Sequence, residues 1–516
     1  MITSNNQPFE YAIIGAGPGG LQLASCLERR GANYVVLEAG PQAGSFFGEY
    51  PRHGQLISIN KINTGCDDYE TNLRWDWNSL LGSKPLSFRS YSERFFPSRQ
   101  SMVKYLADFA RAENLNIQFG CKTNSIAKDG DGFVLTSETG LKLRARVVVV
   151  ATGLSRPNTP DFPGVELGTH YVDFEIDPAK YKNKRVLIVG KGNSAFETAD
   201  AMIEYASSIH LCSPHPTKLA WATHYVGNVR AVNNNFLDTY QLKSQNVILD
   251  AVIQSLEPEA GGVRANIVYT HAMEERRSVW YDQVLLCTGF RMDRSIFDSS
   301  CLPEVTTCGR LPMQTCEWES TNVPDLFFVG TLMQMRDYKK TMSGFIHGFR
   351  HNALALDSIL AAKYEGKPWT GVPLESSTET IADTILDRLN RSAAIFLQPG
   401  YLCDLIVQQP DGMLHLVEGV PKDYVRSSSF FDSEMLITIS LEYGDFSKIA
   451  DPFNIDREPF EDKAHLAAYL HPILRIFERG ELIQEKHLLE DLENDYSGPL
   501  WRERVLEFVS QHLFVT

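Results

Sequence analysis

The sequence has no C-x-x-C pair among its nine cysteines, and their spacing matches no zinc-binding pattern. It also lacks an excess of positive charge, because 49 lysine and arginine residues stand against 64 acidic residues and give a net charge of -15. Nucleic acids and anionic membranes both require a basic face on their protein partner. We therefore expect no resident metal, no nucleic-acid or membrane partner, and a small molecule as the substrate.

Long apolar runs are absent as well. The run VVVVATGL, residues 147–154, is far too short to span a bilayer, and the opening MITSNNQPFE has neither the basic nor the apolar region of a signal peptide. We therefore expect a soluble, cytoplasmic protein. Its 516 residues, of which 43% are hydrophobic, are enough for two or three domains with their own cores.

The sequence does contain a dinucleotide-binding fingerprint near its start. The apolar stretch YAII precedes a G-x-G-x-x-G pattern, and the helical pattern LQLASCLERR follows it. Such glycines let the backbone approach a pyrophosphate, which binds at the N-terminus of the helix. An acid 23 residues after the first glycine is placed to bind a ribose 2′-hydroxyl. The candidate residues of this first unit are Gly15, Gly17, Gly20 and Glu38.

A second fingerprint lies in RVLIVGKGNSAFETA, residues 185–199, with alanine at its third position. The same offset of 23 residues gives a serine here instead of an acid. The following SPHPTK offers a hydroxyl, an imidazole and an ammonium that could hold a 2′-phosphate, which favours NADPH, although an ordinary surface loop is the alternative. The candidate residues of this second unit are Gly190, Gly192, Ser194, Ala195, Ser213, His215 and Lys218.

Three later segments are predicted to be strands that stop at a glycine beside a nucleotide. They are LKLRARVVVV, QVLLCTGF and DLFFVGT. The candidate residues that follow or close them are Thr152, Gly153, Gly289 and Gly330.

This order of segments resembles that of the two-dinucleotide-binding-domain flavoproteins. The runs SFFGEYPRHGQLISINK, LRWDWNSLL, GKGNSAFETA and SGFIHGFRH resemble the FAD-dependent oxidoreductase domain-containing proteins, which include a member of the endoplasmic reticulum and are related to class B flavin monooxygenases. The resemblance implies an α/β fold with FAD and NADPH as cofactors. It places a Rossmann-like FAD domain at 8–158 and 319–372, an inserted NADPH domain at 159–318, and an α+β domain at 376–516.

The same resemblance has limits that bear on location and reaction. The chain lacks a signal peptide and a C-terminal retention tetrapeptide, so a role in the endoplasmic reticulum is not expected to transfer. The stretch AGPQAGSFFGEYPRHG, residues 39–54, contains no cysteine, which argues against thiol–disulfide transfer. NADPH-reduced FAD without another acceptor meets oxygen, so we expect a C4a-(hydro)peroxyflavin that transfers one oxygen atom.

Several side chains are candidates near the flavin. Asn60 resembles the asparagine that some flavin monooxygenases place near C4a, with turn formation as the alternative. Backbone N–H groups at Gly344, where a helix is expected to start, could face the flavin pyrimidine. His170 lies in FPGVELGTHYVDF, a linker that matches the flavin-monooxygenase signature imperfectly. It is equally interpreted as an NADP-organising residue or as a surface histidine.

Two features relate to a halogenase alternative, in which the same flavin species oxidises a halide. Lys243 could support a hypohalous species, as a lysine does in flavin-dependent halogenases. Trp75 and Trp77 form a W-x-W pattern without the isoleucine and proline that complete the halogenase motif. We therefore interpret the two tryptophans as core residues.

The last part of the chain shows no catalytic motif. It is predicted to contain a helix over 378–396, a hairpin turn at PDG and a second helical region over 464–480. It could cover the substrate cleft or pair with another subunit to form a homo-oligomer. The expected function is a single-component NADPH-dependent FAD monooxygenase that uses O2 and a small organic substrate. A single-component halogenase and a flavin-bearing module with a protein partner are the alternatives.

Overall fold

A computed structural model describes residues 8–240, 245–445, 451 and 454–513. The first domain is built on a seven-stranded sheet in the order β3-β2-β1-β6-β5-β4, with β16 also paired to β6. Strands β1, β2, β3 and β16 run parallel to their neighbours, whereas β4, β5 and β6 form an antiparallel meander. The strands are β1 (Phe9–Ile14), β2 (Tyr34–Leu37), β3 (Ile117–Gln118), β4 (Thr123–Asp129), β5 (Gly132–Ser137), β6 (Lys142–Val150) and β16 (Leu326–Phe328).

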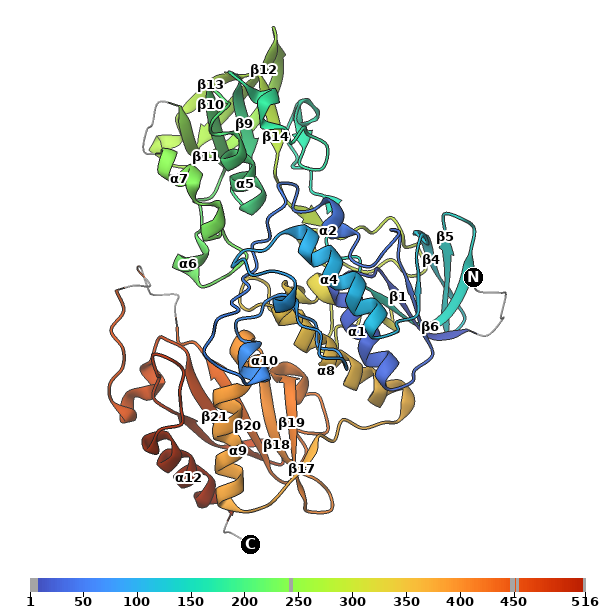
Figure 1. Cartoon of the computed structure of the whole chain (residues 1–516), viewed down its shortest axis with the longest axis vertical. Helices are drawn as coiled ribbons and strands as arrows, with labels where there is room; N and C mark the ends of the chain where they lie inside the picture. Colours follow the sequence, from blue (N-terminus) through green and yellow to red (C-terminus); the bar gives the residue numbers. More distant parts are fainter. Residues whose placement is uncertain (1–7, 241–244, 446–450, 452–453, 514–516) are drawn as a thin grey trace.

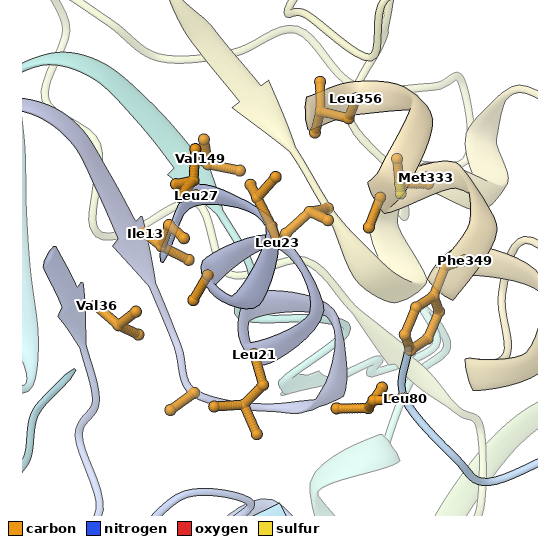
Figure 2. Close-up of a cluster of buried hydrophobic side chains, with 14 of the residues drawn as sticks. Ile13, Leu21, Leu23, Leu27, Val36, Leu80, Val149, Met333, Phe349 and Leu356 are labelled. Atoms are coloured by element: carbon orange, nitrogen blue, oxygen red, sulfur yellow. The ribbon is translucent and has the colours of Figure 1, made fainter. Parts of the chain in front are cut away.

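Three long helices cover one face of this sheet. They are α1 (Pro18–Arg29), α4 (Arg99–Ala112) and α8 (Ile346–Glu365). Helix α1 lies between the sheet and α8, and its Leu23 and Leu27 pack between Ile13 of β1 and Leu356 of α8 (Figure 2). Apolar residues recur at helical spacing on the buried face of α4, where Met102, Leu106 and Phe109 are fully covered, as the sequence predicts.

The second domain is inserted after β6 and is drawn in green at the top of Figure 1. Its sheet has the order β13-β12-β11-β10-β9-β14-β8, and α5 (Asn193–Met202) follows β9. The chain enters through β7 (Arg156–Pro157) and returns through β15 (Phe290–Arg291), which pair with each other. The strands are β8 (Thr169–His170), β9 (Arg185–Val189), β10 (Ser208–Ser213), β11 (Asn246–Glu259), β12 (Gly262–Tyr269), β13 (Arg276–Tyr281) and β14 (Gln283–Leu286).

The inserted domain ends earlier than the sequence suggests. Met292, Phe297 and Cys301 are buried in the same apolar cluster as Ile126 and Phe328 of the first domain. The backbone N–H of Ile126 also donates a 2.7 Å hydrogen bond to the carbonyl of residue 296. The segment 292–318 therefore packs with the first domain and not with 159–291. The β15–β7 pairing marks the return of the chain, and this long-range pairing has no signature in the local sequence.

The third domain carries an antiparallel sheet in the order β17-β19-β18-β20-β21-β22, with α9 and α12 packed against each other (Figure 1). The PDG turn joins β18 to β19 as predicted. The expected helix over 378–396 is divided into two at Ser392, whose side chain caps the second. The elements are β17 (Val372–Leu374), α9 (Thr378–Arg391), α10 (Ala393–Leu397), β18 (Leu402–Gln408), β19 (Leu414–Pro421), β20 (Leu436–Glu442), β21 (His471–Glu478), β22 (Glu481–His487) and α12 (Pro499–Leu513).

The prediction of a helical region over 464–480 is wrong. Only a short 3-10 turn, Glu461–Leu466, precedes β21, which pairs with β20 on one side and β22 on the other. Pro472 lies in the middle of the supposed helix, where it cannot donate the backbone hydrogen bond that a helix needs. The buried Ile473, Leu474 and Ile476 are covered on the sheet instead.

No described helix is both long enough and apolar enough to cross a membrane.

Candidate functional site

A cavity of about 730 Å³ runs from the first domain to the inserted domain. Its size lies within the usual range for sites that hold small molecules and cofactors. Of the residues predicted from sequence, its walls include Gly15, Gly17, Glu38, Thr152, Gly153, Ser194, Gly330 and Gly344. The other described candidates do not line it, and they are Gly20, Asn60, Gly190, Gly192, Ala195, Ser213, His215, Lys218 and Gly289. Lys243 falls outside the described residues.

Two glycines of the first fingerprint, Gly20 and Gly17, differ in the space around them. A Cβ on Gly20 would lie 2.1 Å from the carbonyl oxygen of Gly15, so this position is closed by the protein itself. A Cβ on Gly17 would meet no atom within 4 Å, because it would project into open space at the start of α1. No side chain caps α1, which leaves backbone N–H groups there for an anion. The turn therefore fits the pyrophosphate of a dinucleotide.

Glu38 lines the cavity and is held by backbone hydrogen bonds. Its carboxylate accepts hydrogen bonds from the backbone N–H groups of Ala16 and Gly40, both at 2.7 Å, and only 8% of the residue is exposed. A carboxylate has about four acceptor sites, so capacity remains for the two ribose hydroxyls. On the same cavity, the hydroxyl of Thr152 is buried with no hydrogen-bond partner in the described structure. These groups fit an adenosine diphosphate moiety.

The second fingerprint repeats the open and closed glycines. A Cβ on Gly190 would lie 2.2 Å from the carbonyl oxygen of Cys287, whereas one on Gly192 would meet nothing within 4 Å. Gly192 precedes α5 just as Gly17 precedes α1, and again no side chain caps the helix. The start of α5 therefore fits a second pyrophosphate.

The three residues predicted to hold a 2′-phosphate lie at the surface beyond β10. Ser213 is half-buried at the end of this strand, and its hydroxyl donates to the carbonyl of His215 at 3.3 Å. His215 and Lys218 are exposed. An acid does lie nearby, because Asp250 of β11 is the neighbour of Ser213 across the sheet, but it forms an ion pair with the buried Lys191.

Sequence reasoning missed Glu197, an acid of α5 that lines the cavity. The residue is 9% exposed and accepts a hydrogen bond from the hydroxyl of Tyr171. Burial raises the pKa of its carboxyl to about 7. The sequence did contain a sign of this residue. In AFETA, on the helix of the second fingerprint, Glu197 is an acid among small and apolar residues.

One part of the cavity wall, which we call its aromatic end, is formed by stacked rings. Trp77 and His347 both line it, and their rings stack with centroids 4.3 Å apart and planes 21° apart. Trp77 is thus a wall residue of the cavity, in addition to the packing role predicted for it. The guanidinium of Arg230, from the inserted domain, lies over the Trp77 ring, 5.1 Å from its centroid. Sequence reasoning did not single out His347.

Asn60 lies apart from the cavity wall. It is 1% exposed, and its amide donates a 2.5 Å hydrogen bond to the backbone carbonyl of Ser92. The amide of Asn60 thus joins two segments 32 residues apart, and its side-chain oxygen is buried without a hydrogen-bond partner in the described structure. His170 contacts the hydroxyl of Thr159 at 3.1 Å and sits on the edge strand β8 of the inserted domain.

The third domain reaches the site through Gln398. Its side-chain oxygen accepts from the backbone N–H of Met342 at 2.7 Å, and its amide donates to the Ser343 hydroxyl at 2.8 Å and to Asn352 at 3.0 Å. These residues immediately precede Gly344 or lie on α8. The third domain therefore holds the turn that leads into α8 in place.

All nine cysteines are free, and Cys121 is the one that contributes to the cavity wall among the described residues. It lies beside Glu38, because its backbone N–H donates to the Glu38 carbonyl at 2.8 Å. Within the described ranges, no group of three or more histidine, cysteine or acidic side chains could hold a metal ion.

Comparisons with known proteins agree with this geometry. Residues 12–330 match the family described as pyridine nucleotide-disulphide oxidoreductase. The chain is 34% identical to FAD-dependent oxidoreductase domain-containing protein 2 of Mus musculus, over 95% of this chain and 82% of the relative, and 33% identical to that of Danio rerio, over 98% and 83%. A flavin-containing monooxygenase from Stenotrophomonas maltophilia shares the fold, with 21% identity, a TM-score of 0.54, and coverage of 69% of this chain and 99% of that one.

Both the family match and the two vertebrate relatives extend across the two fingerprints. They confirm the expected two-dinucleotide-binding-domain fold, and membership of this family gives the two units FAD and NADPH as their cofactors. The chain therefore belongs to the pyridine nucleotide-disulphide oxidoreductase family, in its group of FAD-dependent oxidoreductase domain-containing flavoproteins.

Proposed function

We propose that the protein is a single-component NADPH-dependent FAD monooxygenase that oxygenates a small organic molecule. The observation that carries the proposal is one cavity shared by both dinucleotide units, with no cysteine at its aromatic end among the described residues. Electrons that reach a flavin in this cavity have no dithiol to continue to. Oxygen is then the natural acceptor.

The direction of FAD in the cavity follows from the first fingerprint. Glu38 would hold the adenosine ribose and Gly17 leaves room for the pyrophosphate, whereas Gly330, Gly344 and His347 would line the part of the cavity that holds the flavin ring. Bound there, FAD supplies hydride acceptance and reactivity with O2. Asn193, Ser194 and Glu197 of the second unit line the same cavity and bring the nicotinamide of NADPH to the ring.

Aromatic and hydrogen-bond contacts join the first domain to the inserted domain beside this cavity. Tyr50 of the first domain stacks on Tyr171 of the inserted domain with centroids 6.1 Å apart, and it meets Phe290 edge-on at 5.8 Å. Arg52 adds hydrogen bonds to the carbonyls of Tyr171 and Phe174, at 2.6 and 2.7 Å. These contacts fix the inserted domain against the first domain beside the cavity that the proposed reaction would use.

The position of Cys121 argues against disulfide reduction. This cysteine adjoins Glu38, the residue that would hold the adenosine ribose of FAD, and not the residues that would line the flavin ring. A thiol–disulfide mechanism needs a redox-active sulfur in contact with the ring. The family name, pyridine nucleotide-disulphide oxidoreductase, therefore describes the ancestry of the fold better than the reaction of this chain.

The test supplies purified protein with NADPH, isotopically labelled O2 and an extract of cell metabolites in halide-free buffer. We expect NADPH consumption and a product that carries one labelled oxygen atom, detected by mass spectrometry. Reduction of a small aromatic disulfide at the expense of NADPH, without any labelled product, would show that the protein is a disulfide reductase instead.

The same assay separates the two alternatives. A halogenase would require bromide or chloride and leave the product unlabelled, and its candidate residue Lys243 lies outside the described part of the chain. A flavin-bearing interaction module would consume NADPH only when a protein partner is added. NADPH turnover by the protein alone disfavours that module.

A further inference from the structure

A buried imidazole without a hydrogen-bond partner stands at the aromatic end of the cavity. His347 is 1% exposed, and neither of its ring nitrogens has a partner within the described structure. Buried polar groups are nearly always hydrogen-bonded, because an unsatisfied group loses its contact with water and gains nothing in return. His347 also lines the cavity, so a molecule bound there can supply the missing partner.

Two aromatic rings pack nearly parallel to the imidazole of His347. Trp77 stacks on the imidazole with centroids 4.3 Å apart, and Phe345 lies nearly parallel to it, with centroids 5.9 Å and planes 16° apart. Hydrogen bonds of an imidazole run in the plane of the ring. The two nearly parallel neighbours hold the imidazole at a fixed angle, and His347 contributes to the wall of the cavity.

The protein also fixes the charge of the ring. Burial lowers the pKa of His347 well below its ordinary value, and the guanidinium groups of Arg350 and Arg230 lower it further. The imidazole is neutral in the physiological range, with one N–H donor and one acceptor nitrogen. The pyrimidine edge of a flavin carries carbonyl oxygens and an N–H group, which match this pair.

We propose that His347 is a cofactor-contacting residue that donates a hydrogen bond to the pyrimidine edge of the flavin and stabilises its reduced form. The inference rests on the orientation of FAD in the proposed function, in which the ring lies next to Gly344 and the first turn of α8. His347, in the first turn of α8, lines the cavity together with Phe349 of the same helix. Reduction adds negative charge to this half of the ring, so a donor there favours the reduced state.

The experiment measures the midpoint potential and visible spectrum of the flavin in purified holoprotein without substrate. His347→Phe keeps a ring between Trp77 and Phe345 but removes both nitrogens. Loss of a hydrogen bond to a charged group changes an equilibrium about tenfold or more, so we expect the potential to fall by about 30 mV or more for this two-electron couple. His347→Gln restores an N–H donor and should recover at least half of the shift.

His351 provides the matched control. It lies one turn further along α8, is buried and accepts a 3.3 Å hydrogen bond from Arg350, but it does not line the cavity. His351→Phe should leave the potential and the spectrum unchanged. A general disturbance of α8 would move the values in both phenylalanine variants.

Each outcome has a definite meaning. A flavin-loaded His347→Phe variant with the potential and spectrum of the unmodified protein would overturn this inference and leave the proposed function intact. An unmodified protein that binds no flavin would overturn both. If His347→Phe fails to retain flavin, His347→Leu, which also lacks the nitrogens, takes its place in the comparison with His347→Gln.

Discussion

The two fingerprint units of this protein share a backbone but differ at the side chains that matter. In both, a strand leads into a helix through an extended glycine, and a Cβ on Gly17 or Gly192 would enter open space. The two units differ at the third position of the fingerprint. Gly20 packs against the backbone of Gly15 and leaves no room for a Cβ, whereas Ala195 carries a Cβ in the buried core. The turn geometry is therefore the common requirement, and the tightness of the helix against the strand is local to each unit.

The acids of the two units differ more strongly. Glu38 in the first unit is fixed by two backbone donors and faces the cavity. In the second unit, Ser213 occupies the matching place, and the neighbouring Asp250 is neutralised by Lys191. A free carboxylate near a 2′-phosphate would repel it, so this ion pair is compatible with NADPH. The two units therefore differ in the charge beside the matching position, and in the second unit that charge comes from an adjacent strand.

The largest expected effect, loss of nucleotide binding, comes from placing a side chain at Gly17 or at Gly192. Gly17→Val should abolish FAD binding and yield a colourless protein, because the new side chain fills the space for the pyrophosphate. Gly192→Val should remain yellow but lose reduction of the flavin by NADPH. Absorbance spectra before and after anaerobic addition of NADPH measure both effects.

Both glycines have an extended backbone that valine adopts without strain, so the two variants serve as controls for each other's folding. Circular dichroism should show the native fold in each. A Gly17→Val protein with a full complement of flavin would show that the first unit is not the FAD site.

A smaller effect is expected for the choice between NADPH and NADH. Lys218→Ala removes an exposed ammonium that is free to meet a 2′-phosphate, so it should reduce the preference for NADPH about 10- to 150-fold. The measurement is kcat/KM for each nucleotide in flavin reduction. Equal use of both nucleotides by the unmodified protein would contradict the interpretation of the second unit. Lys180→Ala, at an exposed lysine in the turn before β9, provides a charge-matched control.

The smallest effect concerns the position seven residues after the first glycine of each fingerprint. In the first unit this is Gln22, whose amide binds the backbone of Leu81, and in the second it is Glu197. Glu197→Gln makes the second unit resemble the first in this respect. Because burial raises the pKa of Glu197 to about 7, ionisation costs the folded state free energy above that pH.

The sign follows from proton uptake. Between the ordinary carboxyl pKa and about 7, the folded protein binds more protons at Glu197 than the unfolded chain does, so this group destabilises the fold as pH rises. Glu197→Gln should therefore raise the free energy of unfolding by on the order of 1 kcal/mol at about pH 8, and by less at about pH 5. Urea unfolding at the two pH values measures the difference. An equal gain at both would contradict the raised pKa.

The sequence predicted the features that depend on neighbouring residues in the chain. Both fingerprints, the α4 face and the PDG hairpin are local patterns, and the structure has them where they were expected. Glu197 and His347 could not be found in this way, because their burial and their place on the cavity depend on segments hundreds of residues away. The strand β21 was missed because its pairing with β20 and β22 outweighed the helical pattern.

The interrupted first domain has a consequence for how the chain is made. Strand β16 joins the sheet beside β6, and the whole inserted domain lies between them in the sequence. During synthesis the ribosome releases β9, α5 and β10 before Leu326 exists, so the inserted domain can fold while the first sheet still has an open side at β6. Until β16 is synthesised, the N-terminal part of the first domain has an exposed strand edge at β6 and exposed apolar surface. Slowing translation between residues 291 and 326 should therefore favour aggregation, whereas early binding of FAD at Gly17 should protect the waiting half.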